Sequence, residues 1–288
     1  MLIEIIKAIL FGIVEGITEW LPISSTGHLI LVEQFVKLTE VSPEFWSMFQ
    51  VVIQLGAILA VVLLYWNKIW PITTNKKKAI KQTGLLSYLN KDIMLLWAKI
   101  LVACIPAAVI GLLFDEVFEA LFYNPFCIAL ALIIFGVAFI VVENFNKKKE
   151  SKKLKEKNSQ ITYKDAIIIG IFQLLAAIFP GTSRSGATII GGLLIGLSRP
   201  NAAEFTFYLA IPTMLGASLL KLVKFGLGFT GIELAILLVG MIVSFLVSVL
   251  VIKFLMSYIK KHNFKPFGYY RIVLGIIVLV YFCLIRSM

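Results

Sequence analysis

The chain has 288 residues, of which 60% are hydrophobic and only 15% are charged, and its mean hydropathy is +0.95. Soluble domains are about half apolar and about one quarter charged, so this composition excludes a soluble globular protein and indicates an integral membrane protein. The formal net charge of +11 does not indicate a nucleic-acid partner, because the lysines concentrate in the segments between apolar runs.

The first apolar region along the chain, 3–38, is interrupted near its middle by Pro22 and a group of polar residues. It lacks the small-residue cleavage site of a removable signal peptide. Its two halves are about 15 residues long, which is too short to cross a bilayer. A second region, 163–198, is interrupted in the same way at Pro180. Because broken backbone at membrane depth must be buried in protein or line a wet cavity, we predict that each region is a re-entrant helical hairpin.

Six other apolar runs are near 20 residues long, the length that spans a bilayer as a helix. We place these transmembrane helices at 45–66, 93–113, 125–143, 202–224, 230–255 and 268–286. Lysines gather in the loops 67–92, 144–164 and 256–267, whereas the loops 39–44, 114–124 and 225–229 contain no Lys or Arg. The positive-inside rule therefore places the lysine-rich loops in the cytoplasm and both termini outside, and it gives the two hairpins opposite orientations.

The two hairpins also resemble each other in sequence. At a constant offset of 158 residues, Gly12 aligns with Gly170, Pro22 with Pro180, and Ser25 with Ser183. We therefore predict an all-α membrane fold with an inverted-topology repeat, whose halves cover approximately 1–113 and 163–255. In folds of this kind the binding site lies near the midplane of the membrane, where broken helices of the two halves face each other.

The tips of the two hairpins are the candidate functional site, because ionisable residues inside a membrane are costly and usually functional. The candidate catalytic residues are Glu19, Ser25, His28 and Arg184. The candidate substrate-binding residues are Ser24, Thr26, Ser183, Ser185 and Thr188, with Thr182 beside them.

The second tip has the features of a site for an anion. Arg184 lies between two serines, after a Pro-Gly break and before a helix. Free backbone N–H groups at a helix start and a planar guanidinium both favour phosphate. The alternatives are that Ser183 or Ser185 only caps the helix and that Arg184 extends to the membrane surface.

The first tip adds the groups that phosphoryl transfer needs. Ser25 is a candidate nucleophile, activated by Glu19 or His28, and an activated water is the other candidate. Two carboxylates beside an anion repel it unless one is protonated or a cation bridges them, so we expect Mg²⁺ or Ca²⁺ with Glu15 and Glu19 as ligands. The alternatives are that His28 is a structural, hydrogen-bonded residue and that the hydroxyls of this tip only cap a helix.

These residues resemble the two signature motifs of the bacterial undecaprenyl-diphosphatase family, also called bacitracin-resistance proteins. The motifs stand in this sequence as EGITEWLPISSTGH (15–28) and PGTSRSGAT (180–188), and the likeness covers nearly the whole chain. The resemblance implies removal of the terminal phosphate from undecaprenyl diphosphate, which yields the monophosphate carrier of cell-wall assembly. It also implies stimulation by divalent cations and a site open to the external face of the bacterial cell membrane.

Position by position, the resemblance makes three residues the most critical and gives four others a supporting role. The critical residues are Glu19, Ser25 and Arg184, and the supporting ones are Glu15, His28, Ser183 and Thr188. Arg199 and Arg271 also match arginines of the family, although both fit interfacial anchors near helix ends equally well.

Three matters stay open at this point. A transporter or flippase of a polyprenyl phosphate is the rival function, since inverted repeats with broken helices are typical of transporters, whereas the Glu, Ser and His cluster favours an enzyme.

The expected partners are a polyprenyl diphosphate and the lipid bilayer, and a homodimer is compatible with the sequence, which leaves the oligomeric state open. Cys104, Cys127 and Cys283 lie in apolar runs without metal-like spacing, so we interpret them as small buried residues.

Overall fold

The computed structural model describes residues 1–75, 77–81, 84–151, 161–226 and 228–282 of the chain. Its helices are α1 (Leu2–Thr18), α2 (Ser25–Phe35), α3 (Pro43–Val52), α4 (Gln54–Ile69), a 3₁₀ turn (Leu85–Tyr88), α5 (Lys91–Phe122), α6 (Pro125–Ser151), α7 (Tyr163–Ile178), α8 (Arg184–Leu194), α9 (Arg199–Phe225), α10 (Gly231–Tyr258) and α11 (Lys265–Val280). Within these residues, extended pairing is limited to two isolated antiparallel bridges, Ile72–Leu89 and Ala79–Asn90. The prediction of an all-α fold is confirmed for this part of the chain.

Five segments of the described chain are long and apolar enough to span a membrane: Pro43–Ile69, Lys91–Gly111, Pro125–Lys147, Arg199–Phe225 and Gly231–Tyr258. They coincide with five of the predicted transmembrane helices. The sixth, 268–286, stays a prediction, because α11 has 16 residues and positions 283–288 lie outside the described residues.

Two helices extend well beyond their predicted ends. α5 continues past 113 to Phe122, and α6 continues past 143 to Ser151. The lysine-rich segment predicted as a loop at 144–164 therefore begins as helix, and its positions 152–160 lie outside the described residues. A hydropathy pattern ends where charge begins, whereas a helix continues into the aqueous phase as long as its own hydrogen bonds are formed.

Hydroxyl side chains fix the first turn of several helices. Thr162 and Thr230 each form a capping box, with Asp165 and Glu233 three residues later. In such a box the hydroxyl accepts from a free N–H of the first turn, and the acid accepts from the cap's own N–H. These local signals set where α7 and α10 begin, and hence how deep the residues that follow them lie.

The two halves of the chain pack on each other reciprocally. α1 packs along α10, α5 packs along α7, and α6 packs along α11. Glycines permit the close approach: a Cβ on Gly12 would lie 2.8 Å from the carbonyl oxygen of Gly240, and a Cβ on Gly136 would lie 2.8 Å from that of Gly268. The pairing includes α6 and α11, which lie outside the predicted repeat halves 1–113 and 163–255.

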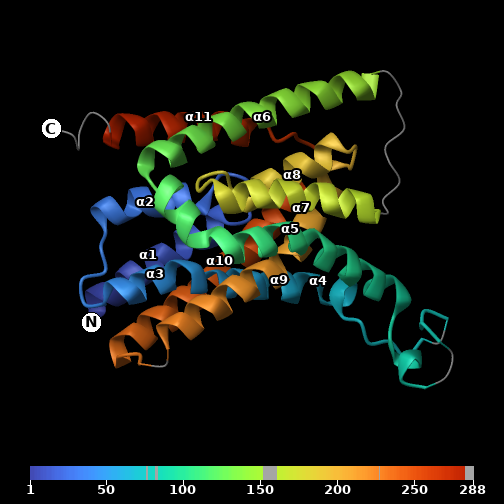
Figure 1. Ribbon diagram of the computed structural model, residues 1–288, viewed down its shortest axis with the longest axis horizontal. Coiled ribbons are helices and arrows are strands. Elements are labelled where there is room, and N and C mark those ends of the chain that lie inside the picture. The colour runs from blue at the N-terminus through green and yellow to red at the C-terminus, as the bar shows by residue number, and fades with distance from the viewer. Residues whose placement is uncertain (76, 82–83, 152–160, 227, 283–288) are drawn as a thin grey trace.

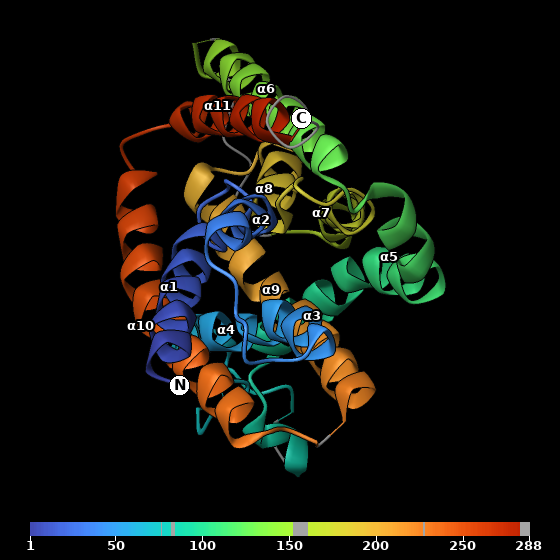
Figure 2. The same cartoon turned by 90° about the vertical axis from the view of Figure 1, so that its left-hand side faces the viewer.

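The short helices α2 and α8 lie in the interior of the arrangement, with the longer helices around them (Figure 1, Figure 2). Figure 1 shows the N-terminus and the α2–α3 connection at the left end, and the start of α7 and the α4–α5 connection at the right end. The hairpins α1–α2 and α7–α8 thus start from opposite ends of the molecule, and their tips meet between them.

Candidate active site

Each hairpin tip turns sharply into the helix that follows it. Ser24 precedes α2 with φ 75° and ψ 102°, and Ser183 precedes α8 with φ 67° and ψ 115°. In the described chain, these serines are the two residues other than glycine with positive φ. Each hydroxyl accepts from the first turn, from Gly27 N–H at 3.4 Å and from Gly186 N–H at 3.1 Å. A backbone conformation of this kind costs about 1–3 kcal/mol, so both tips are specially constrained.

The caps correct the register of the repeat by one residue. Ser24, rather than Ser25, is the counterpart of Ser183. Pro22 lies two residues before its cap, whereas Pro180 lies three residues before its cap, so the second tip has one residue more. Ser25 therefore corresponds to Arg184, and both stand at the first position of their helices.

The carboxylate of Glu19 joins the two tips. Its Oε1 accepts a hydrogen bond from Nη2 of Arg184 at 2.8 Å, and its Oε2 accepts one from the Ser25 hydroxyl at 2.9 Å. Glu19 and Ser25 are buried, and the Arg184 side chain is 12% exposed. The structure thus brings three of the four predicted catalytic residues into one hydrogen-bonded row, and Arg184 is held inside the protein.

The guanidinium of Arg184 is also held from its other sides. Nη1 donates to the carbonyl oxygen of Thr206 in α9 at 3.1 Å, and the group lies 6.0 Å from the centroid of the Trp20 ring. Nε has no hydrogen-bond partner among the described residues. The arginine is therefore oriented by protein contacts and keeps N–H groups that an oxyanion could accept from.

The predicted substrate-binding hydroxyls of the second tip take part in bonds within the protein. Ser185 donates to the carbonyl oxygen of Glu19 at 3.0 Å, so the Ser183 hydroxyl, at 3.1 Å, must be the donor between the two serines. The Thr188 hydroxyl lies 2.9 Å from the Thr206 hydroxyl and is fully buried. These three residues hold the tip against Glu19 and α9.

His28 is bonded through both ring nitrogens. Nδ1 lies 2.7 Å from the carbonyl oxygen of Ser24, which can only accept, so Nδ1 carries a proton. In the neutral ring Nε2 then accepts from the hydroxyl of Tyr270, also at 2.7 Å, and the two rings are parallel. The Ser25 hydroxyl donates to Glu19 and not to His28. Of the two predicted activating groups, the structure therefore favours Glu19.

Glu15 and Thr26 are placed differently from their neighbours. Glu15 lies one turn before Glu19 on α1, and its backbone carbonyl accepts from Glu19 N–H at 3.0 Å. Its carboxylate is fully buried, and neither oxygen has a hydrogen-bond partner in the described chain. Thr26 is half-buried in the first turn of α2. The Glu15 carboxylate, which has no hydrogen-bond partner among the described residues and lies one turn from Glu19, fits the predicted cation site. Mg²⁺ is commonly held by one or two carboxylates together with substrate phosphates.

The environment of Arg271 differs most from the one predicted from the sequence. Arg271 is fully buried, and its guanidinium donates to the carbonyl oxygens of Pro22 at 3.3 Å, Gly181 at 3.1 Å and Thr182 at 2.8 Å. Arg271 thus bonds the backbone of both tips at once and is not an interfacial anchor. A single arginine inside an otherwise apolar segment was the signal that could have identified it.

Arg199 has a different role, outside this cluster. It forms a bidentate ion pair with the buried Glu143 of α6, at 2.9 and 2.7 Å. The same carboxylate accepts from the backbone N–H of Phe264, just before α11. Arg199 therefore fixes α9, α6 and the start of α11 to one another.

The two cysteines in the described chain are free and half-buried, in agreement with a packing role. Cys104 contacts the Thr213 hydroxyl and Cys127 the Asn124 side chain. The third, Cys283, lies outside the described residues.

A helical membrane fold whose two broken segments meet in a buried row of carboxylate, guanidinium and hydroxyl defines a class: membrane proteins with an embedded site suited to phosphate groups. The chain belongs to the family described as bacitracin resistance protein BacA, which matches residues 8–277.

Curated relatives resemble the chain over nearly its full length. A protein named undecaprenyl-diphosphatase from Desulfitobacterium hafniense is 64% identical over 98% of this chain and 97% of its own. One of the same name from Lachnoclostridium phytofermentans is 60% identical over 99% of both chains. Undecaprenyl-diphosphatase 1 from Clostridium acetobutylicum is 58% identical over 98% of this chain and 99% of its own.

Proposed function

We propose that the protein hydrolyses undecaprenyl diphosphate to undecaprenyl phosphate and inorganic phosphate, and so recycles the lipid carrier of cell-wall synthesis. Membership of the family and the names of relatives at 58–64% identity support this activity. The structural observation on which the proposal rests is the hydrogen-bonded row Ser25–Glu19–Arg184. In the proposal these buried residues are the nucleophile, the base and the phosphate ligand.

In the proposed reaction Ser25 is the nucleophile. Its hydroxyl already donates to Glu19 Oε2 at 2.9 Å, which is the geometry in which a carboxylate takes the proton. Serine Oγ bonds to the terminal phosphorus while the bond from that phosphorus to the bridging oxygen breaks, and undecaprenyl phosphate leaves with the electron pair. Water then attacks the phosphorus of the phosphoserine and gives a proton to the solvent, the bond from phosphorus to Ser25 Oγ breaks, Oγ takes back the proton held by Glu19, and inorganic phosphate leaves. Direct attack by a water on Glu19 is the competing route.

Arg184 receives the terminal phosphate in this scheme. The guanidinium matches the planar arrangement of phosphate oxygens, and the first turns of α2 and α8 present backbone N–H groups to the same place. A phosphate that binds Arg184 competes with Glu19 Oε1 for Nη2. Binding of substrate therefore releases Glu19 from its ion pair and leaves the carboxylate as the acceptor for the serine proton.

Glu15 and Glu19 would hold the divalent cation. Such an ion supplies charge neutralisation for a diphosphate beside two carboxylates. The buried and unpartnered oxygens of Glu15 support this assignment. The remaining hydroxyls, of Ser24, Thr26, Ser183, Ser185 and Thr188, keep the tips in place around the phosphate.

The membrane arrangement is the second part of the proposal. α1–α2 and α7–α8 are re-entrant hairpins, and the polyprenyl chain of the substrate lies between helices with its diphosphate at the tips. The reciprocal pairing of α1 with α10 and of α5 with α7 supports an inverted repeat, and the pairing of α6 with α11 extends each half to residues near 1–151 and 161–282. The lysine-rich connections support cytoplasmic loops, and the family resemblance supports a site open to the external face of the cell membrane.

Phosphate release from undecaprenyl diphosphate by the purified full-length protein in detergent, with Mg²⁺ or Ca²⁺, tests the activity. Ser25→Ala should reduce the rate by at least about a hundredfold, while Ser47→Ala, on an exposed position of α3, should retain it. No release by the wild-type protein with either cation would reject the hydrolase. Movement of a polyprenyl phosphate across vesicles without any hydrolysis would instead support the transporter.

A second measurement distinguishes the two nucleophiles. With a labelled terminal phosphate and an acid quench, the phosphoserine route predicts label on the peptide that contains Ser25. A hydrolysing enzyme that never carries label, and whose Ser25→Ala variant keeps its rate, would assign the attack to water.

A further inference from the structure

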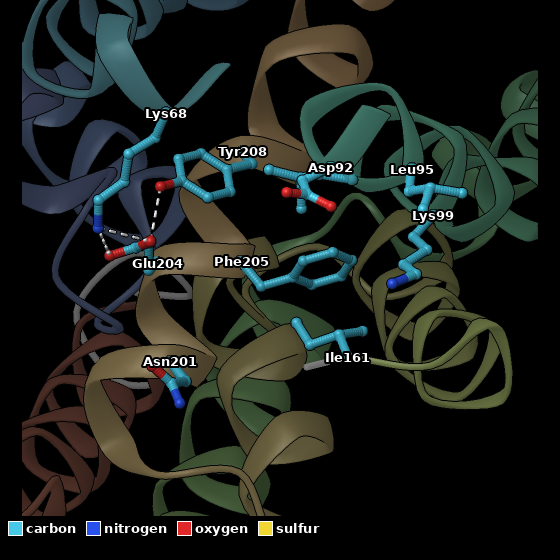
Figure 3. A pocket seen from close by; sticks show the side chains of 10 residues that line it. Lys68, Asp92, Leu95, Lys99, Ile161, Asn201, Glu204, Phe205 and Tyr208 are labelled. Atoms are coloured by element: carbon cyan, nitrogen blue, oxygen red, sulfur yellow. Dashed lines mark hydrogen bonds and ion pairs between the residues drawn. The ribbon is translucent and has the colours of Figure 1, made fainter. Parts of the chain in front are cut away.

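A cavity of about 290 Å³, with polar and apolar walls, is lined by residues outside the candidate active site (Figure 3). Its walls come from the end of α4, the first turns of α5 and the first turns of α9, with Ile161 closing one side. Figure 3 shows Lys68 and Glu204 on one side of it and Asp92 and Lys99 on the other. A volume near 300 Å³ is at the lower limit for small-molecule sites, so the cavity suits a headgroup rather than a lipid chain.

The charges that face this cavity are balanced. Lys68 is paired with Glu204 at 2.8 Å, and the hydroxyl of Tyr208 donates to the same carboxylate at 2.7 Å. Asp92 and Lys99 remain, and no ion pair joins them in the described part of the chain. The Lys99 ammonium lies 5.9 Å from the centroid of the Tyr163 ring, a contact that orients the charge without neutralising it.

Asp92 and Lys99 are two turns apart on one face of α5, about 10 Å along the helix axis. Leu95 lies between them and is 40% exposed. An anion alone would meet the carboxylates of Asp92 and Glu204, and a cation alone would meet the two lysines. A ligand with both signs of charge and an apolar body satisfies all of these groups.

The cavity lies where several candidate membrane-spanning segments end or begin, which is where lipid headgroups are expected. The spanning segments Pro43–Ile69, Lys91–Gly111 and Arg199–Phe225 all end or begin at its walls. Beside it, the stacked rings of Trp66 and Trp70 are 44% and 43% exposed, as is usual for aromatic residues at a membrane–water interface.

We propose that this cavity binds the zwitterionic headgroup of a membrane phospholipid of the phosphoethanolamine type. The phosphate lies against Lys99, the ammonium lies against Asp92, and Leu95, between them, packs against the ethylene carbons that join the two groups. The Lys68–Glu204 pair forms the far wall. This site is independent of the hydrolytic activity proposed above.

The cavity and the hairpin-tip cluster adjoin the same part of α9 from different sides. Glu204 and Tyr208 of α9 line the cavity, and Thr206 between them accepts from Arg184 and contacts the Thr188 hydroxyl. A lipid in the cavity therefore packs on the same helical turn that orients Arg184.

Lipid binding to the purified full-length protein, measured by native mass spectrometry, tests the proposal. The probes are phosphatidylethanolamine and phosphatidylglycerol with identical acyl chains. We expect the ethanolamine lipid to bind more tightly. Asp92→Asn should weaken its binding about fivefold or more, because the ammonium loses a partner, and should not weaken the glycerol lipid, which loses only a repulsive carboxylate. Lys99→Gln should weaken both lipids.

Two control variants each remove one charge at a position outside the cavity. Lys91→Gln and Glu44→Gln remove exposed charges and should leave both affinities as in the wild type. The shift of the unfolding midpoint on adding the ethanolamine lipid is a second readout, which Asp92→Asn should reduce. Equal affinity for the two lipids, tighter binding of the glycerol lipid, or an Asp92→Asn variant with unchanged preference would each overturn the proposal.

Discussion

Replacing Arg271 with Met tests whether one buried side chain holds the two hairpin tips together. Arg271 is fully buried, and its guanidinium donates to five backbone carbonyl oxygens. These are Thr182 at 2.8 Å, Gly181 at 3.1 Å, Pro22 at 3.3 Å, and Ala131 and Leu132 at 3.4 Å. Methionine fills much of the same space and donates nothing, so the carbonyls lose their partner without a large cavity.

The loss of folding stability in Arg271→Met can be worked out from these hydrogen bonds. A hydrogen bond to a charged group contributes about 1.5–3 kcal/mol, and two of the five are short. A buried carbonyl oxygen left without a donor costs about 1–3 kcal/mol. We therefore expect Arg271→Met to lower the unfolding midpoint by roughly 10 °C, measured on purified protein in detergent.

Activity should fall further than stability alone explains. Among the described residues, Arg271 forms its hydrogen bonds with backbone carbonyls and none with the side chains of Ser25, Glu19 or Arg184, but it bonds Pro22 and Thr182, which lie just before the two strained caps. A displacement of about 1 Å at a reacting group can cost about a hundredfold in rate. We expect kcat for phosphate release to fall by about that factor, at a temperature where the variant is still folded, with a smaller change in KM.

The control is Arg271→Lys, which keeps a charge and three donors. It should recover part of the stability but less of the rate, because one ammonium cannot reach the carbonyls of both tips as the planar fork does. An Arg271→Met protein with the unfolding midpoint and kcat of the wild type would refute the positioning role.

Three further predictions concern the tips and the helix packing. Ser24→Gly and Ser24→Ala both remove the capping hydroxyl, but only glycine accepts φ 75° without strain. The Ser24→Gly variant should therefore unfold at a higher temperature than Ser24→Ala, by an amount equivalent to about 1 kcal/mol. Equal unfolding midpoints of the two variants would contradict the strain at Ser24. Gly16→Ala places a Cβ 2.8 Å from a backbone oxygen of α10 and should destabilise by about 1–3 kcal/mol in the same assay, whereas Gly216→Ala, in open space on α9, should be neutral or stabilising. Glu15→Gln should raise the cation concentration for half-maximal activity about tenfold or more if Glu15 is a ligand, and an unchanged cation titration would remove it from the cation site.

The sequence was sufficient to predict that the two tips meet, because that inference needed only the sides of the membrane and the breaks in two apolar regions. Lysine placement gave the hairpins opposite orientations, and the structure brings Glu19 and Arg184 to 2.8 Å. The match between Ser25 and Ser183 was wrong by one residue. A constant offset cannot represent the extra residue between Pro180 and its cap, which becomes visible only through the backbone angles.

The sequence could mark Arg271 as unusual but could not predict its bonding partners, for a different reason. Arg271 lies seven positions into α11, close to the lysines that mark a membrane boundary, and its depth depends on how α11 packs against α6. That packing needs the close approach of Gly136 and Gly268. Neither glycine belongs to a motif that would have predicted this contact from the sequence. The partners of Arg271 are backbone carbonyls, and a sequence gives no residue type to pair with them.

The strained caps and Arg271 belong to one arrangement. A positive φ at a serine persists only if the surrounding structure holds it in place, because relaxing it would recover about 1–3 kcal/mol. Here the holding groups are visible: Arg271 bonds the carbonyls of Pro22 and Thr182, and Ser185 bonds the carbonyl of Glu19. Both turns are thereby fixed so that α2 and α8 begin at the same place, with Ser25 and Arg184 at their first positions and Glu19 between them. The strain at the tips is therefore the cost of bringing two helix N-termini together beside Glu19, at the place where we propose that the phosphate binds.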